Sequence, residues 1–328
     1  MTTRRSRRKR AAQEAAPPPP QMADRRLMEQ QMAAIGRLLE GHEFTSAEEA
    51  NAYLQDVLSR GGLPPAAPTT PLEEAQELIY QALETSGKQR LDLARQALAI
   101  SPDCADAYVL LAEATEDPHE ARCLYEQGVH AGERALGPEM FERDAGHFWG
   151  ILETRPYMRA RQGLAEVLWY LGERRAAIAH LQDMLRLNPG DNQGLRYTLA
   201  NWLLAVGDDA ALERLLAQYP DEGSAQWAYT KALHTFRRLG AGKQADKALQ
   251  AALEVNPHVP AYLLGVKKLP KPLPTYIGMG DENEAVWYAA QAAEPWVATP
   301  GALEWFAAVL TRRAAPSPSP RPGRARRK

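Results

Sequence analysis

Apolar and small residues return at a fixed spacing over a long stretch of the chain, from Pro71 to Pro257. The window that ends at Pro189 is matched, 68 residues later, by the window that ends at Pro257. The matched pairs are Leu164 and Ala232, Gly172 and Gly240, Ala177 and Ala245, Leu181 and Leu249, Leu185 and Leu253, Leu187 and Val255, and Asn188 and Asn256. A pattern that repeats in this way predicts one structural unit used several times.

Two less regular copies fill the rest of this stretch. One has Leu199, Gly207, Leu212 and Leu216, each 35 residues after Leu164, Gly172, Ala177 and Leu181, and the other ends at Pro102. Small residues such as Ala165, Ala177 and Ala245 let two antiparallel helices approach, Gly172 and Gly240 make the turns, and Pro189 and Pro257 end the second helices. Because one pair cannot bury its apolar face alone, pairs must stack. The sequence therefore predicts an all-α superhelix, an α-solenoid of helical hairpins.

The segments that flank the repeats differ in character. We expect a disordered basic and proline-rich tail over 1–24, an N-terminal helical pair over 25–60, a proline-rich linker over 61–71, repeats over 72–257, a proline-rich strap with capping helices over 258–310, and a disordered basic tail over 311–328. Capping boxes at Ser46–Glu49 and Thr70–Glu73 predict two helix starts. Asp281 is expected to cap the helix that follows an extended strap.

Charge is distributed unevenly along the chain. The net charge is -2, but residues 1–10 carry six basic side chains and residues 311–328 carry seven, which leaves a net charge of -15 for residues 11–310. The tails suit nucleic acid or anionic lipid by charge alone, but they lack the interleaved aromatics that stack on bases. Since no segment has the roughly 18 apolar residues of a membrane span, and the two cysteines fit a reducing compartment, the sequence predicts a cytoplasmic protein.

Candidate catalytic and metal-binding residues are few. His119 and Cys123 lie four positions apart, with Cys104 and His130 nearby in sequence, but two ligands at helical spacing do not make a zinc site. The segment Gly240–Lys243 has neither the earlier glycine nor the hydroxyl residue of a phosphate loop. No nucleophile elbow, zinc-protease or dinucleotide motif is present. We therefore predict no catalytic residue, metal or cofactor, and no enzyme activity.

The repeats resemble the tetratricopeptide family, whose period is about 34 residues. A more specific resemblance, over about residues 94–310, is to the suppressor-of-tumorigenicity-seven family. Its signature segments here are Pro102–Glu113, Asn256–Leu264, Leu269-Pro270, Gly280–Ala285 with Tyr288-Ala289, and Gly301–Leu303. That family offers no catalytic residues to transfer. Members from higher organisms are membrane-associated, and this property is not carried over because no spanning helix is predicted here.

The resemblance to tetratricopeptide repeats implies a partner-binding groove, since the first helix of each pair turns one face inward. By repeat register this face consists of Arg159, Gln162, Glu166, Trp169, Tyr197, Asn201, Trp227, Thr230, His234 and Arg237. Aromatic and arginine side chains are typical of binding hot spots, although Trp169 and Trp227 fit equally well as packing between helices. The preferred interpretation is a scaffold that binds a peptide or helix of another protein. A nucleic-acid-associated factor that uses its tails is the alternative, and an enzyme with an unrecognised site is the third.

Overall fold

The computed structural model describes residues 25–40, 42–60 and 67–314, and within them the protein is all-α, with no strand. The two predicted tails, apart from residues 311–314, and most of the predicted linker lie outside the described residues. The chain divides into two compact units, Met1–Pro102 and Asp103–Lys328.

The first unit contains four described helices: α1 (Arg25–Glu40), α2 (Ala47–Ser59), α3 (Pro71–Leu83) and α4 (Gly87–Ile100). The predicted capping box forms at α3, where Thr70 accepts from the Glu73 amide and the Glu73 carboxylate accepts from the Thr70 amide. At α2 only half of the box forms, because the Glu49 carboxylate accepts from Thr45 instead of Ser46. α3 packs against α4 and α1.

The second unit contains the hairpins. Its elements are α5 (Ala105–Ala112), α6 (Pro118–Arg143), the 3-10 turns η1 (Phe148–Gly150) and η2 (Leu152–Thr154), α7 (Arg155–Tyr170), α8 (Arg174–Leu187), α9 (Leu195–Val206), α10 (Asp209–Gln218), α11 (Ala225–Leu239), α12 (Lys243–Val255), α13 (Val259–Leu263), α14 (Glu282–Ala298) and α15 (Ala302–Ala314). α15 therefore runs four residues into the segment predicted to be disordered.

Three successive hairpins, α7–α8, α9–α10 and α11–α12, correspond to the repeats seen in the sequence. Gly172, Gly207 and Gly240 connect their helices at φ of 85°, 76° and 69°, a region that L side chains rarely adopt. Leu164 and Ala232 occupy equivalent buried positions in the first helices of their pairs. The predicted helical-hairpin solenoid is confirmed.

Residues 126–157 exceed the repeat period, and the structure shows why. α6 is broken at Gly137, which has φ of 69° and precedes Pro138, a residue that cannot donate a helical hydrogen bond. The two 3-10 turns follow before α7 begins. α6 and α7 pack closely because Gly163 has no side chain: a Cβ at this position would lie 2.2 Å from the Tyr125 ring. The extra residues thus form a long, bent partner for α7.

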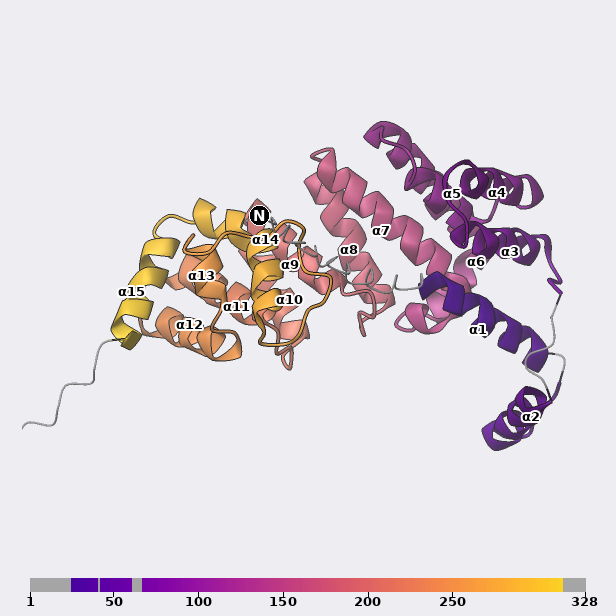
Figure 1. Ribbon diagram of the computed structural model, residues 1–328, viewed down its shortest axis with the longest axis horizontal. Helices are drawn as coiled ribbons and strands as arrows, with labels where there is room; N and C mark the ends of the chain where they lie inside the picture. Colours follow the sequence, from indigo (N-terminus) through magenta and orange to yellow (C-terminus); the bar gives the residue numbers. More distant parts are fainter. Residues whose placement is uncertain (1–24, 41, 61–66, 315–328) are drawn as a thin grey trace, which may run out of the picture. The chain divides into compact units, whose positions relative to one another are not determined.

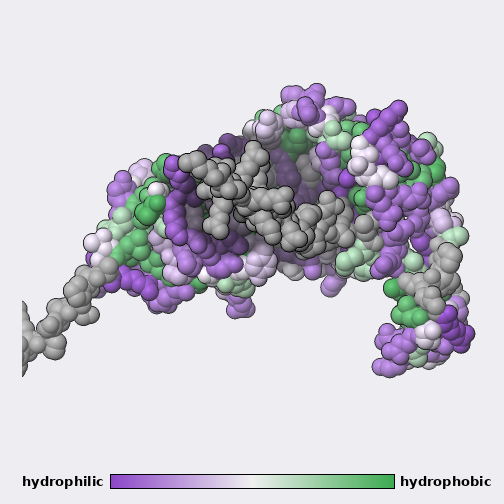
Figure 2. Space-filling model, viewed as in Figure 1, coloured by the Kyte–Doolittle hydropathy of each residue, from purple (hydrophilic) through white to green (hydrophobic). Residues whose placement is uncertain are grey.

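The strap region is not extended throughout. It opens with the short helix α13, and residues 264–281 then run without helix to the cap of α14. The indole of Trp287 donates to the carbonyl of Pro274 at 2.9 Å and so ties the strap to α14. As predicted, Asp281 caps α14 by accepting from the amide of Glu284. Hydrophobic residues gather at the surface over α13 and α15 (Figure 2).

α14 determines what remains open on the solenoid. It packs against α9 and α11, the first helices of two hairpins, and lies beside α9 in Figure 1. Tyr288 of α14 meets Tyr229 of α11 with ring centroids 5.5 Å apart, and Trp296 is fully buried. The chain's own helix therefore covers the inner face of two hairpins.

Candidate functional site

The predicted residues of α7 lie on one helical face and have different environments. Arg159 forms a two-pronged ion pair with the buried Asp106 of α5, with N–O distances of 2.8 and 2.6 Å. Gln162 connects α7 to the loop between α8 and α9. It donates to Glu166 and accepts from Gln193, both at 2.9 Å. Glu166 itself is exposed. This face is polar and accessible at Gln162 and Glu166.

Trp169 takes part in a layered contact between hairpins. Its ring stacks on Trp202 of α9 at 4.5 Å, with 2° between the planes, and the Arg174 guanidinium lies 4.7 Å from its centroid on the ring face. Both rings are largely buried by this arrangement. The interpretation of Trp169 as packing between helices describes its contacts well, although the ring keeps some exposure.

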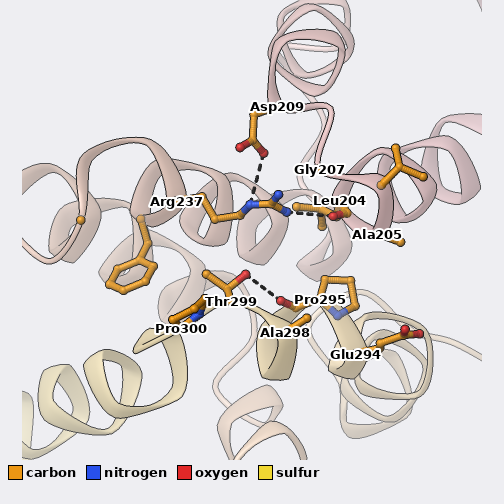
Figure 3. Close-up of a pocket in the computed structure, with 13 residues that line it drawn as sticks. Leu204, Ala205, Gly207, Asp209, Arg237, Glu294, Pro295, Ala298, Thr299 and Pro300 are labelled. Atoms are coloured by element: carbon orange, nitrogen blue, oxygen red, sulfur yellow. Dashed lines mark hydrogen bonds and ion pairs between the residues drawn. The ribbon is translucent and has the colours of Figure 1, made fainter.

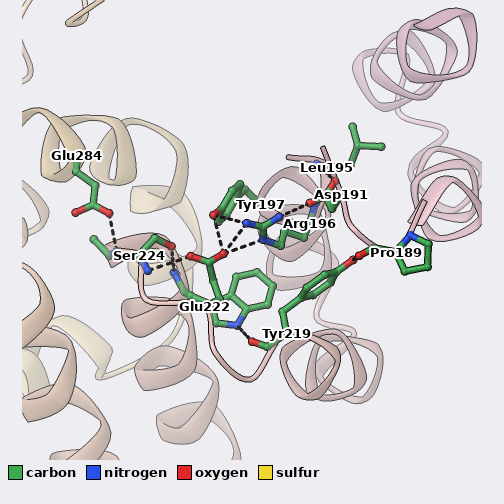
Figure 4. A network of polar contacts seen from close by, with 11 residues as sticks. Pro189, Asp191, Leu195, Arg196, Tyr197, Tyr219, Glu222, Ser224 and Glu284 are labelled. Carbon is green, nitrogen blue, oxygen red and sulfur yellow. Dashed lines mark hydrogen bonds and ion pairs between the residues drawn. The ribbon is translucent and has the colours of Figure 1, made fainter. Parts of the chain in front are cut away.

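Tyr197 belongs to a network that joins the two loops flanking α9 and α10 (Figure 4). Arg196 donates to Asp191 at 2.9 Å and to Glu222 at 2.6 Å, and the Tyr197 hydroxyl donates to the same Glu222 oxygen at 2.8 Å. Tyr219 closes the set by donating to the Pro189 carbonyl at 3.0 Å. These contacts hold the loops in place, so the network is structural.

Burial and charge set the pKa values in this network. Burial alone would raise the pKa of Glu222, but hydrogen bonds from Tyr197 and Arg196 outweigh it and lower the pKa. Burial, followed by the nearby Asp191 carboxylate, raises the pKa of Tyr219 to about 12. Glu222 therefore stays ionised and Tyr219 stays a neutral donor at neutral pH. Neither has the intermediate pKa of a general acid or base.

Four of the predicted groove residues lie in the interior. Trp227 and Thr230 are fully buried, His234 is 5% exposed and Asn201 is 9% exposed. The Trp227 indole donates to the Tyr219 carbonyl at 3.1 Å, and a ring nitrogen of His234 lies 3.0 Å from the Asp209 carbonyl. They present little or no surface to a partner.

The reason for this burial is partly α14. Asn201 donates to Gln291 of α14 at 3.2 Å, and the amide of Ala225 at the start of α11 donates to Glu284 at 2.8 Å. Repeat register predicts which residues face inward, but it gives no information about a later helix that packs against them. Glu284 and Gln291 were not among the predicted residues.

Arg237 lines a pocket at the far end of the same face. The cavity, about 580 Å³, lies where α9, α11 and α14 end (Figure 3). The guanidinium of Arg237 donates to the Leu204 carbonyl at 2.8 Å and lies 3.3 Å from an Asp209 carboxylate oxygen. Glu294 is the third charged residue of the lining. The sequence singled out Arg237 but not the pocket, which needs contacts between segments about 90 positions apart.

The two cysteines do not converge on a metal site. Cys104 is buried, which raises the pKa of its thiol to about 12, and Cys123 is exposed and accepts from Gln127 at 3.2 Å. Over the described ranges, no group of three or more His, Cys, Asp or Glu residues is arranged to hold a metal ion. In the same part of the chain, no helix is both long and apolar enough to cross a membrane.

Fold and surface together define an all-α helical-repeat protein whose inner face is partly filled by its own helix. The family model described as ST7 protein matches residues 69–320, and the chain belongs to this family. Its relatives include the suppressor of tumorigenicity 7 protein-like of Bos taurus, 31% identical over 243 residues, which are 67% of this chain and 44% of the relative. The protein ST7 homolog of Caenorhabditis elegans is 29% identical over 269 residues, 69% of this chain and 48% of the relative. This chain thus spans less than half the length of these relatives.

Proposed function

We propose that this chain is a non-enzymatic interaction scaffold that holds a peptide or helix of a partner protein against the first helices of its hairpins. The observation that carries the proposal is the position of α14. A helix already lies against α9 and α11, through rings that pack together and through the Asn201–Gln291 and Ala225–Glu284 hydrogen bonds. This is the helix-in-groove mode by which many proteins recognise an amphipathic segment.

The part of this face that α14 leaves open is on α7. Gln162, Glu166 and Tyr170 follow one another at spacings of four and therefore share one side of the helix. Tyr170 is 77% exposed and Glu166 is exposed as well. An exposed tyrosine beside polar groups combines apolar contact area with a hydrogen-bonding hydroxyl, which suits a binding anchor. We call these three residues the open α7 face.

Site-specific crosslinking tests the proposal on the full chain. A photoreactive phenylalanine analogue at Tyr170 is expected to give covalent adducts with one discrete protein, whereas the same analogue at the exposed Gln182 of α8 is expected to give none above background. A second arm combines Glu166→Lys with Tyr170→Ser, which should reduce recovery of that protein at least tenfold without a change in melting temperature. Equal adducts at both positions, or unchanged recovery, would contradict the proposal.

A further inference from the structure

The pocket around Arg237 lies where three helices end. α9 ends at Val206, α11 at Leu239 and α14 at Ala298, and residues from the last turn of each line the cavity (Figure 3). The carboxyl end of a helix carries a partial negative charge of roughly half an electron, because its last carbonyls point outward. Three such ends border one cavity of about 580 Å³, and together they favour a cation over an anion there.

The charged side chains add to this field. Asp209 and Glu294 are negative and Arg237 is positive, so the formal charge of the lining is -1 before the helix ends are counted. Arg237 shows which chemistry the site accepts, because its guanidinium is held by the Leu204 carbonyl at the end of α9 and by Asp209. Glu294 is exposed and lies on α14 at the edge of the lining, with its carboxylate turned away from Arg237 (Figure 3).

From this geometry we infer that the pocket receives an arginine or lysine side chain from the segment of a partner protein. A guanidinium or ammonium group would meet Glu294 and the last turns of α9 and α14, and the apolar stem would lie against Ala205, Ala298 and Pro300. An anionic group is disfavoured, because Asp209 already neutralises the single cation. The inference rests on the proposed function and names the chemistry of the segment that the scaffold holds.

Peptide binding to the full chain tests the inference. The probe is a fluorescein-labelled, end-blocked dodecapeptide of alternating arginine and serine, and fluorescence anisotropy reports its affinity. Glu294→Gln is expected to weaken binding about twofold to fivefold, as for the loss of one exposed ion pair. Glu254→Gln is the matched control: Glu254 is exposed on α12, does not line the pocket, and its replacement removes the same charge.

A second variant separates binding from stability. Ala298→Lys places a tethered ammonium in the pocket, which should repel the probe and weaken binding more than tenfold. Because a cation near the carboxyl end of α14 is favourable, the melting temperature should hold or rise. A peptide of residues 315–328 serves as competitor; if it binds at least tenfold more tightly than the probe, the occupant is the chain's own tail and the inference about a partner is overturned.

The failure of this inference is distinct from failure of the scaffold proposal. If Glu294→Gln and Ala298→Lys bind the probe as tightly as Glu254→Gln, the pocket does not receive a cation, whatever the crosslinking at Tyr170 shows. If the pocket variants lose the probe but Tyr170 gives no discrete adduct, the pocket is supported and the open α7 face is not.

Discussion

Two regions of the same solenoid use equivalent helix faces in different ways. Over α9 and α11 the inner face is covered by α14, and the predicted groove residue Asn201, which donates to Gln291 of α14, is buried there. On α7 the equivalent face keeps Glu166 and Tyr170 exposed. Register alone therefore gives the direction of a side chain, whereas later segments of the chain decide whether it meets a partner or the protein's own core.

The largest expected effect is on the covered region. Trp227→Ala removes a fully buried ring, its edge-on contact with Tyr197 at 6.1 Å and its hydrogen bond to Tyr219. We expect a loss of about 3–5 kcal/mol in the free energy of unfolding, as for other buried tryptophans. Trp169→Ala, in the open region, should cost about 1–2 kcal/mol because its stacked ring keeps some exposure. Urea denaturation measures both, and equal losses would contradict the comparison.

Weakening the contacts that hold α14 in place should make α9 and α11 more accessible, as α7 already is. Glu284 is 7% exposed and accepts from the Ala225 amide, the Asn256 side chain and the Gly280 amide. Glu284→Ala leaves these donors without their acceptor, which should cost about 2–3 kcal/mol.

Hydrogen exchange gives the regional readout for this variant. Amides of α9 and α11 should exchange faster in Glu284→Ala, while those of α7 should not change. Glu294→Ala is the control on the same helix, since Glu294 is exposed and its loss should stay within about 0.5 kcal/mol. Uniform acceleration over all three helices would show that α14 is not a local cover.

The open region depends on a close approach on its other side. Gly163→Ala would place a Cβ 2.2 Å from the Tyr125 ring, so α6 and α7 must separate or the ring must move. The expected cost is about 1–3 kcal/mol, typical of overpacking. In a Tyr125→Ala background the same substitution should cost less than about 0.5 kcal/mol, since the ring is gone; a cost that persists would place the strain elsewhere.

Local patterns accounted for the hairpins and their caps. Glycines at positive φ and capping residues act over a few neighbours, so Gly172, Gly240, Thr70 and Asp281 reveal their roles in the sequence itself. Gly163 was missed, although a glycine within a predicted helix is itself a sign of close packing. The position of α14 could not be predicted, because residues 264–281 have no periodicity and the Asn201–Gln291 contact joins residues 90 positions apart.

The smallest expected effect is a dependence of stability on pH, and it arises in the open region. His180 of α8 is partly buried; burial first, and then the charge of Arg161, lower its pKa from 6.5. Arg161 donates to Nδ1 of His180 at 3.2 Å, so a proton at that nitrogen would displace the hydrogen bond. The carboxylates of Asp183, Glu126 and Glu133 act in the opposite direction and do not outweigh these causes.

Because the folded pKa of His180 lies below the unfolded value, the unfolded state binds the proton more readily. Stability should therefore fall as pH drops through about 6.5 and should stop falling below the folded pKa. The loss linked to Asp183, whose pKa is lowered from 3.8, begins only at more acidic pH, so the two windows are separate. Urea denaturation at pH 7.5 and 5.5 should show a smaller difference for His180→Asn than for the unaltered chain. An identical difference would mean that the proton is taken up elsewhere and that α7 and α8 contain no pH-sensitive contact at this position.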